Sequence, residues 1–179
     1  MKDKFAGISL DKKIIMGIMN LSSETFYEGS LVKGSEKVAE RAEKMVNEGA
    51  QILDLGALST GPNVEPISED EEIEKLLPAV NAVEGRVDVP ISIDTQRAEV
   101  AERALEAGAD IINDVSGFKA DPQMVKVAAS TDSHAILMAN RISGRIRTAE
   151  KSGADIENIG EIKEGLRESI RICEENEVE

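Results

Sequence analysis

The stretch GAQILD at residues 49–54 decides the expected fold, and a close copy, GADIIN, recurs at residues 108–113. In each copy, Gly-Ala ends a segment with helical spacing, and a short apolar run then leads to a polar residue five positions after the glycine. Glycine is typical of a helix C-terminus, and the apolar run is typical of a strand. The repeat therefore indicates βα units and a parallel sheet. A weaker third copy, GADIEN at 153–158, is interrupted by Glu157.

Apolar runs and segments of helical spacing alternate along most of the chain. The apolar runs, which we interpret as strands buried on both faces, are IIMGIM (14–19), QILDLG (51–56), VPISID (89–94), DIINDV (110–115) and HAILMA (134–139). The predicted helices are 35–49, 69–85, 98–108 and 121–131, with a last amphipathic one at 159–179. Gly49, Gly85 and Gly108 are predicted to cap three of them.

This order predicts an α/β fold, namely a partial (β/α)8 TIM barrel with parallel strands and about five βα units. A complete barrel takes about 250 residues and at least about 200, whereas this chain has 179. We therefore expect residues 1–179 to form one domain, the N-terminal part of a barrel that stops before its sixth strand. A fragment of a longer protein and a natural partial barrel both fit this length.

The composition narrows the classes of partner. A net charge of −14, spread along the predicted helices, argues against nucleic acid. It does not argue against a small anion, because backbone N–H groups at helix N-termini bind phosphate locally. With one cysteine, Cys173, and one isolated histidine, His134, we expect no disulfide and no zinc cluster, and a structural role for the histidine. No signal peptide or membrane span is recognisable, so we expect a cytoplasmic protein.

Polar residues gather at the carboxyl end of each predicted strand. They are Asn20, Asp54 with Ser59 and Thr60, Asp94 with Thr95, Asn113 with Asp114, and Asn140. In a parallel barrel these ends lie on one face, where ligands bind. Any one of them could instead cap a helix or make a turn, and Ser68 with Glu71 fits a capping box. As a set they favour a binding site.

Two long loops are expected to border this site. They follow the first and second predicted strands, at 21–35 and 57–70, and exceed the two to six residues of ordinary βα turns. Phe26 and Tyr27 lie in the first loop. An aromatic side chain there could cover a planar ligand or pack back on the barrel rim.

Four ordered motifs then resemble one family. They are IMGIMNLSSETF (15–26), GAQILDLGALSTGPNVEPISEDEE (49–72), ISIDTQRAEVAERALEAGADIINDVSGF (91–118) and ILMAN (136–140). Together they are similar to dihydropteroate synthase, the pterin-binding enzyme of folate-type cofactor synthesis. The resemblance implies an eight-stranded βα barrel that condenses 6-hydroxymethyl-dihydropterin diphosphate with 4-aminobenzoate or a related arylamine. It also implies Mg²⁺ as cofactor, small-molecule partners and a homodimer in the full-length protein.

The resemblance also implies roles for individual residues. Asn20 would contact Mg²⁺ and the diphosphate, while Asp94 and Asn113 would hydrogen-bond the amino-pyrimidine edge of the pterin. The remaining contacts would be Met138 against the flat ring, Asp54 near the pterin, and Thr60, Pro62 and Phe26 in the arylamine or diphosphate loops. Substitution at the pterin methylene needs no protein nucleophile, so no residue is assigned as catalytic.

Three departures from the family pattern limit this reading. Gly61 replaces the arginine of an STRP loop, Ser23-Glu24 replaces a Pro-Asp pair, and the late-barrel Asp, Lys and Arg-x-His motifs are missing. We therefore expect this chain alone to bind pterin weakly and to be inactive or nearly so. A pterin-dependent methyltransferase domain and a non-catalytic interaction module are the alternatives. The sequence leaves open the folate or methanopterin pathway and the arylamine.

Overall fold

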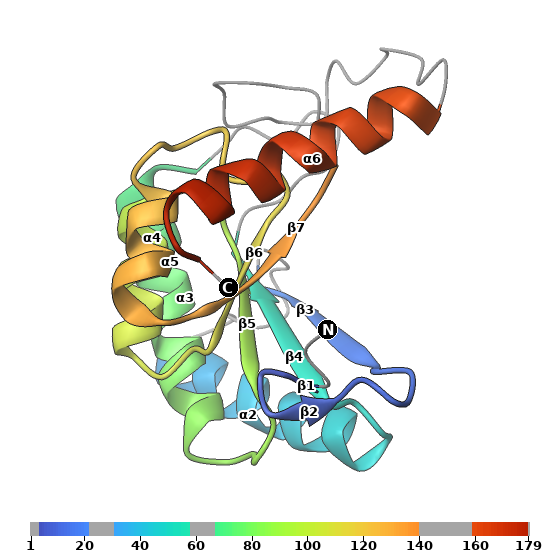
Figure 1. Cartoon of the computed structure of the whole chain (residues 1–179). Coiled ribbons are helices and arrows are strands. Elements are labelled where there is room, and N and C mark those ends of the chain that lie inside the picture. Colours follow the sequence, from blue (N-terminus) through green and yellow to red (C-terminus); the bar gives the residue numbers. More distant parts are fainter. Residues whose placement is uncertain (1–3, 22–30, 58–66, 140–158, 179) are drawn as a thin grey trace.

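The computed structural model describes residues 4–21, 31–57, 67–139 and 159–178, and the other residues lie outside the described part of the chain (Figure 1). Its elements are β1 (Lys4–Phe5), β2 (Ile8–Ser9), β3 (Met16–Asn20), α2 (Leu31–Asn47), β4 (Ile52–Gly56), α3 (Glu69–Glu84), β5 (Ile91–Asp94), α4 (Ala98–Glu106), β6 (Ile111–Asp114), α5 (Met124–Thr131), β7 (His134–Leu137) and α6 (Ile159–Glu175). The five predicted strands and the five predicted helices are all present. The repeat GADIEN falls outside the described residues.

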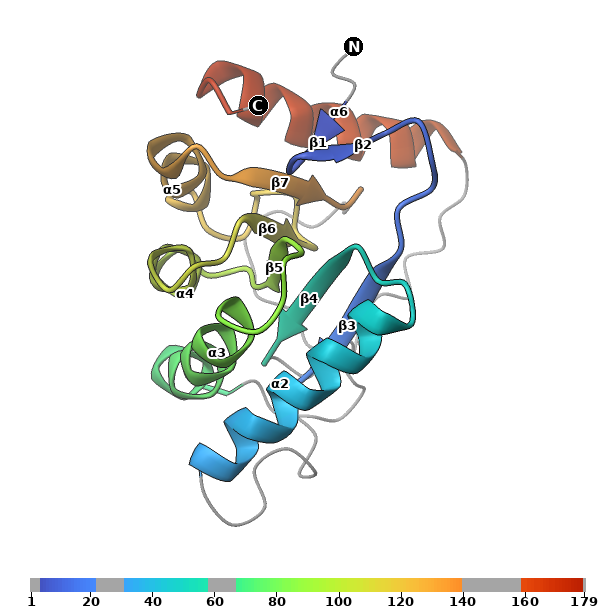
Figure 2. The same cartoon turned by 90° about the horizontal axis from the view of Figure 1, so that it is seen from below.

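The main sheet has five parallel strands in the order β3-β4-β5-β6-β7. Because each new strand joins beside the last and βα crossovers are right-handed, successive helices fall on one face. Figure 2 shows α2 to α5 in a row along that face. A doubly wound sheet would reverse its strand order and place helices on both faces. The sequential order therefore confirms a segment of a βα barrel.

Strand alternation divides the sheet into two chemically different faces. Leu55 pairs with Ile93, and Ile93 with Ile112, and all three are buried in one core with apolar residues of the covering helices. The opposite face, which we call the inner face, is the one that α2 to α5 leave uncovered. It carries Asp54 beside Ser92 and, one pleat further on, the row of paired residues Asn20, Gly56, Asp94, Asn113 and Ile136.

Burial on both faces was predicted for all five strands, and the prediction is wrong for the two outer ones. Ile18 on β3 is 68% exposed, and every residue of β7 is only half-buried. Within the described residues, β3 and β7 are the edges of the sheet, so each has a strand neighbour on one side only. The central strands β4, β5 and β6 are mostly buried, as expected.

The N-terminal hairpin was not predicted. β1 and β2 pair antiparallel around Ala6 and Gly7, which have φ of 45° and 79°, as a two-residue hairpin turn requires. The ring of Phe5 meets His134 edge-on, with centroids 5.2 Å apart. His134 begins β7, at the opposite end of the strand from the predicted site, so its predicted structural role fits this contact.

The helix boundaries follow the expected chemistry. Gly49 and Gly108 have φ of 111° and 108°, so both copies of the Gly-Ala motif turn in the same left-handed conformation that favours glycine. The Ser68–Glu71 capping box is present, since each residue accepts from the backbone N–H of the other. Gly85 is the C-cap of α3, as predicted, and its φ of −83° is one that other residues also adopt. Among the described helices, none has both the length and the apolar character to cross a membrane.

Candidate functional site: a polar floor on the inner face

Asp54, Asp94 and Asn113 come from three neighbouring strands and share the inner face. Asp94 pairs directly with Asn113 on β6 and with Gly56 on β4, and Asp54 lies one pleat before Gly56. Paired residues of parallel strands point to the same side, as do residues two apart along one strand. We call Asp54, Ser92, Asp94 and Asn113 the polar floor. Three of these four were predicted from their positions at strand ends.

Hydrogen bonds hold the polar floor together. Asp54 is 3% exposed and accepts from the hydroxyl of Ser92 at 2.6 Å and from the carboxamide of Asn113 at 3.1 Å. This hydrogen bond fixes the orientation of the Asn113 carboxamide. The carboxamide keeps a second N–H and its carbonyl oxygen for other partners. Ser92 was missed from the sequence. The signal was the alternation in ISID, which places Ser92 on the same face as Asp94.

Asp94 is the most electrostatically perturbed member of the polar floor. Burial raises its pKa to about 7, and the carboxylates of Asp54, Asp114 and Glu72 add to the rise. Gly56 allows this crowding, because a Cβ at position 56 would lie 3.3 Å from the Cβ of Asp94. A carboxyl group that titrates near neutral pH on an uncovered face is a candidate for ligand binding.

Asn20 and Met138 border the polar floor. Asn20 ends β3 and occupies the same cross-strand row as Gly56 and Asp94, while Met138 follows β7 and is 48% exposed. Both therefore stand at the carboxyl ends of strands, where they were predicted. Thr60, Pro62 and Phe26, together with Ser59 and Asn140, lie outside the described residues.

Among the described residues, Asn20 is the one that the resemblance assigns to Mg²⁺. Asn20 offers a carboxamide, and the described residues contain no group of three His, Cys, Asp or Glu side chains suited to a metal ion. Mg²⁺ commonly keeps several waters and takes further oxygens from substrate phosphates. A neutral carboxamide at the strand end fits an ion that arrives with a diphosphate.

Two polar residues expected near the ligand belong instead to the helix side of the sheet. Asp114 is fully buried and accepts from the backbone N–H groups of Ser116 and Phe118 at 2.7 and 2.9 Å, so it shapes the turn after β6. Burial raises the pKa of Asp114, and these hydrogen bonds oppose the rise. Thr95 donates its hydroxyl to Glu72 at 2.7 Å. Both point away from the inner face because each directly follows a residue that faces it.

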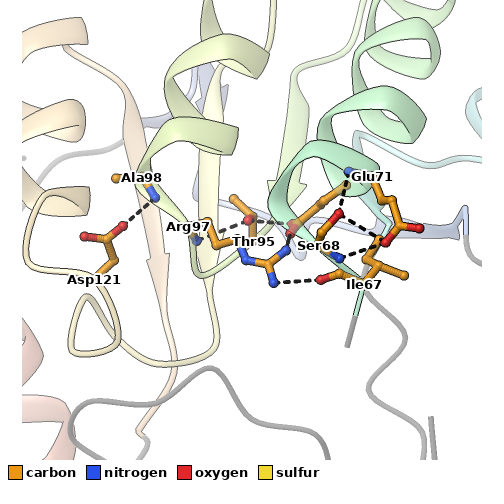
Figure 3. A network of polar contacts seen from close by, with 8 residues as sticks. Ile67, Ser68, Glu71, Thr95, Arg97, Ala98 and Asp121 are labelled. Atoms are coloured by element: carbon orange, nitrogen blue, oxygen red, sulfur yellow. Dashed lines mark hydrogen bonds and ion pairs between the residues drawn. The ribbon is translucent and has the colours of Figure 1, made fainter. Parts of the chain in front are cut away.

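Thr95 and Arg97, labelled in Figure 3, form a buried network with Glu72 that the sequence did not reveal. Arg97 donates an N–H of Nη1 to Glu72 and an N–H of Nη2 to the carbonyl oxygen of Ile67, the latter at 2.8 Å. Burial is the main cause of a raised pKa at Glu72, and its bonds to Thr95 and Arg97 oppose it. The charge runs in the sequence suggested only solvated helix faces, so nothing marked these residues as buried partners.

The polar floor has the chemistry to bind a flat ligand that presents several N–H groups. A carboxylate accepts from such groups, while the carboxamide of Asn113 both donates and accepts. The geometry therefore supports recognition of such a heterocycle.

Known proteins show which family shares this arrangement. Residues 16–179 match the family described as pterin binding enzyme. The chain belongs to the pterin binding enzyme family. The match contains every strand of the main sheet and all four residues of the polar floor.

Individual members of the pterin binding enzyme family agree with the family match. A dihydropteroate synthase from Clostridium beijerinckii is 42% identical over 131 residues, which are 73% of this chain and 49% of that protein. The structure of dihydropteroate synthase from Clostridium difficile in the presence of pteroic acid superposes with a TM-score of 0.82 at 31% identity, covering 94% of this chain and 61% of that one.

A third comparison is with the Xanthomonas albilineans dihydropteroate synthase solved with 4-aminobenzoic acid. It gives a TM-score of 0.78 at 26% identity and covers 97% of this chain and 61% of that one. The chain thus spans about half the length of the Clostridium beijerinckii protein and about three fifths of each of the two solved chains. The partial barrel predicted from the sequence, with its resemblance to the N-terminal portion of dihydropteroate synthase, is confirmed.

Proposed function

We propose that this chain provides the pterin-binding floor of a dihydropteroate synthase. Asp94 and Asn113 would hydrogen-bond the amino-pyrimidine edge of 6-hydroxymethyl-dihydropterin diphosphate, and Met138 would lie against its ring. The observation that carries the proposal is the juxtaposition of Asp54, Asp94 and Asn113 on the inner face, joined by the Asn113–Asp54 hydrogen bond. Family membership and a neighbour solved with pteroic acid support the same ligand class.

The proposed reaction joins the pterin methylene to the amine of 4-aminobenzoate or a related arylamine, with release of diphosphate. The polar floor holds the pterin and keeps its methylene at the carboxyl ends of the strands. Mg²⁺, when bound with the diphosphate, would neutralise charge on the leaving group, and Asn20 would be its protein ligand. A relative solved with 4-aminobenzoic acid supports the arylamine, with Thr60, Pro62 and Phe26 as the proposed contacts.

A methyltransferase or a non-catalytic interaction module is less well supported. The relatives at 37–42% identity are dihydropteroate synthases. We propose further that full turnover needs barrel elements beyond those described, and that this chain alone binds more readily than it reacts. The homodimer expected for the full-length protein stays a prediction.

Calorimetric titration of this chain with 6-hydroxymethylpterin tests the proposed function. We expect saturable binding that Asp94→Ala reduces by at least tenfold. Asp88→Ala, an exposed aspartate in the turn after α3, is the matched control and should bind like the original chain. Unchanged affinity in the Asp94→Ala chain would contradict pterin binding on the inner face.

The metal proposal has a separate test. Mg²⁺ should tighten binding of the pterin diphosphate, and Asn20→Ala should remove that gain without changing the affinity for 6-hydroxymethylpterin, which lacks the diphosphate. A gain from Mg²⁺ that persists in Asn20→Ala would show that Asn20 is not its ligand.

A further inference from the structure

The buried network of Glu72, Thr95 and Arg97 lies directly behind the polar floor. Glu72 is fully buried, Thr95 is 1% exposed and Arg97 is 8% exposed. Replacing a buried ion pair by apolar residues is often neutral or stabilising. Fold stability alone therefore does not explain why a glutamate and an arginine are buried here. The hydrogen bonds of the network suggest another explanation.

The hydroxyl of Thr95 is used both as a hydrogen-bond donor and as an acceptor, which fixes its position. Its hydroxyl donates to Oε1 of Glu72 at 2.7 Å and accepts from the backbone N–H of Arg97 at 3.2 Å. Its own backbone N–H donates to the carbonyl oxygen of Asn113 at 3.2 Å. Because Thr95 directly follows Asp94 and side chains alternate along a strand, a fixed Thr95 on the helix side fixes the direction of Asp94 on the inner face.

Arg97 extends this network to the start of α3. Its guanidinium joins Glu72, in the first turn of α3, to the carbonyl oxygen of Ile67, which precedes the N-cap Ser68 (Figure 3). On the other side, the backbone N–H of Ala98 donates to Asp121 at 2.9 Å. One arginine thus ties the end of β5, which carries Asp94, to the point where the chain enters α3.

We propose that Thr95, Glu72 and Arg97 are positioning residues that hold Asp94 in its pterin-binding orientation. The inference rests on the proposed function for its ligand, and on the hydrogen bonds above for its geometry. These residues would not touch the pterin. They act through Asp94, and through Asn113 by way of the backbone bond from Thr95.

Thr95→Val and Thr95→Ser give the test, because valine keeps the shape of threonine and loses its hydroxyl, whereas serine keeps the hydroxyl. We expect Thr95→Val to bind 6-hydroxymethylpterin about tenfold more weakly, with Thr95→Ser within about threefold of the original chain. The affinity is corrected for the folded fraction measured by circular dichroism. A purely structural role would lower the melting temperature of Thr95→Val and leave the affinity of its folded fraction unchanged, which would overturn the proposal.

Arg97→Met extends the test, with Arg103→Met as its control. Arg103 lies on α4, the helix that Arg97 precedes, and pairs with Glu99 on the exposed surface, so its loss should change pterin affinity by less than about twofold. Arg97→Met should weaken binding at least tenfold. If Arg97→Met does not fold, the Thr95 pair alone decides the proposal.

A measurement without pterin separates this proposal from the proposed function. Carbon-13 NMR can follow the carboxyl group of Asp94 through a pH titration. Since the charge of Glu72 contributes to the raised pKa of Asp94, Glu72→Gln should lower that pKa, and Thr95→Val should change the Asp94 resonance, while Arg103→Met changes neither. If the original chain binds no pterin, the proposed function fails, and an Asp94 resonance unchanged in both variants would then overturn the positioning role as well.

Discussion

The side-chain N–H of Asn113 on β6 donates to Oδ2 of Asp54 on β4 across the intervening strand β5, over 3.1 Å. Strands two apart in a sheet are separated by roughly 9–10 Å, so the contact requires side chains that lean over β5 from both sides. Ser92 on β5 fills the space between them and also donates to Asp54. Asp54 is therefore the acceptor that orders the polar floor.

Asp54→Ala should disorder the polar floor and destabilise the chain. The substitution leaves the fully buried Ser92 hydroxyl without its acceptor and releases Asn113 to rotate. A buried donor without a partner costs about 1–3 kcal/mol, so chemical denaturation should show a loss of that size. Affinity for 6-hydroxymethylpterin should fall at least tenfold. Equal stability of the Asp54→Ala and Asp88→Ala chains would contradict the ordering role.

Pterin affinity should depend on pH through Asp94. Its carboxyl must be ionised to accept from the N–H groups of the pterin, and its pKa is raised to about 7. Each pH unit below that pKa reduces the ionised fraction, and with it the affinity, by about tenfold. Titrations at pH 8 and pH 6 should therefore differ by roughly tenfold, with weaker binding at pH 6. A flat profile across this range would contradict an ionised Asp94 as the acceptor.

Asp94→Asn should stabilise the chain at neutral and higher pH. A carboxyl whose pKa is raised in the folded state binds its proton more tightly there, so its ionisation destabilises the fold, starting near the ordinary pKa of 3.8 and reaching its full size above about 7. A rise of this size corresponds to roughly 4 kcal/mol at about 1.4 kcal/mol per unit. Partial solvation reduces the expected gain to about 1–2 kcal/mol.

The check on Asp94→Asn is denaturant unfolding at several pH values. The variant should be more stable than the original chain at pH 8, and the difference should shrink as the pH falls and be lost only below the ordinary pKa of 3.8, where the carboxyl is protonated in the folded and the unfolded chain. Pterin binding should be lost at the same time, because the carboxylate acceptor is gone. A stability difference that grows toward acid pH would contradict a raised pKa of Asp94 in the folded chain.

Two glycine substitutions should act in opposite directions. Gly85 has φ of −83° and open space around a new Cβ, so Gly85→Ala should stabilise by up to about 1 kcal/mol through the unfolded state. Gly108 has φ of 108°, and a new Cβ would lie 2.5 Å from Glu84 Cγ, so Gly108→Ala should cost about 1–3 kcal/mol. Thermal unfolding of the two variants side by side is the measurement, and equal effects would contradict the assigned backbone conformations.

The strands and the sequential sheet order could be predicted because short apolar runs alternated with periodic segments and with Gly-Ala pairs. The polar residues at strand ends gave Asp54, Asp94 and Asn113. Sequence position alone could not tell which of two adjacent polar residues faces the ligand, so Thr95 and Asp114 were grouped with their neighbours. One-residue alternation along the strand decides that, and it depends on register.

Other features depend on contacts that are distant in the chain. Arg97 meets Glu72 from 25 positions away, and Phe5 meets His134 across most of the chain; no local pattern encodes either pair. The exposure of Ile18 follows from its place on an edge strand, which an apolar run does not reveal. Gly85 caps α3 as predicted, but the residue type did not reveal that its φ, −83°, is one that other residues also adopt.

The most direct measurement is a titration of isotope-labelled chain with 6-hydroxymethylpterin, followed residue by residue by NMR. We expect saturable shifts that are largest at Asp54, Asp94 and Asn113 and small on the helix face of the sheet. Shifts gathered instead around the hollow of about 470 Å³ lined by Asp110, Ser133 and His134, at the opposite ends of the strands, or no shifts at all, would contradict pterin binding on the inner face.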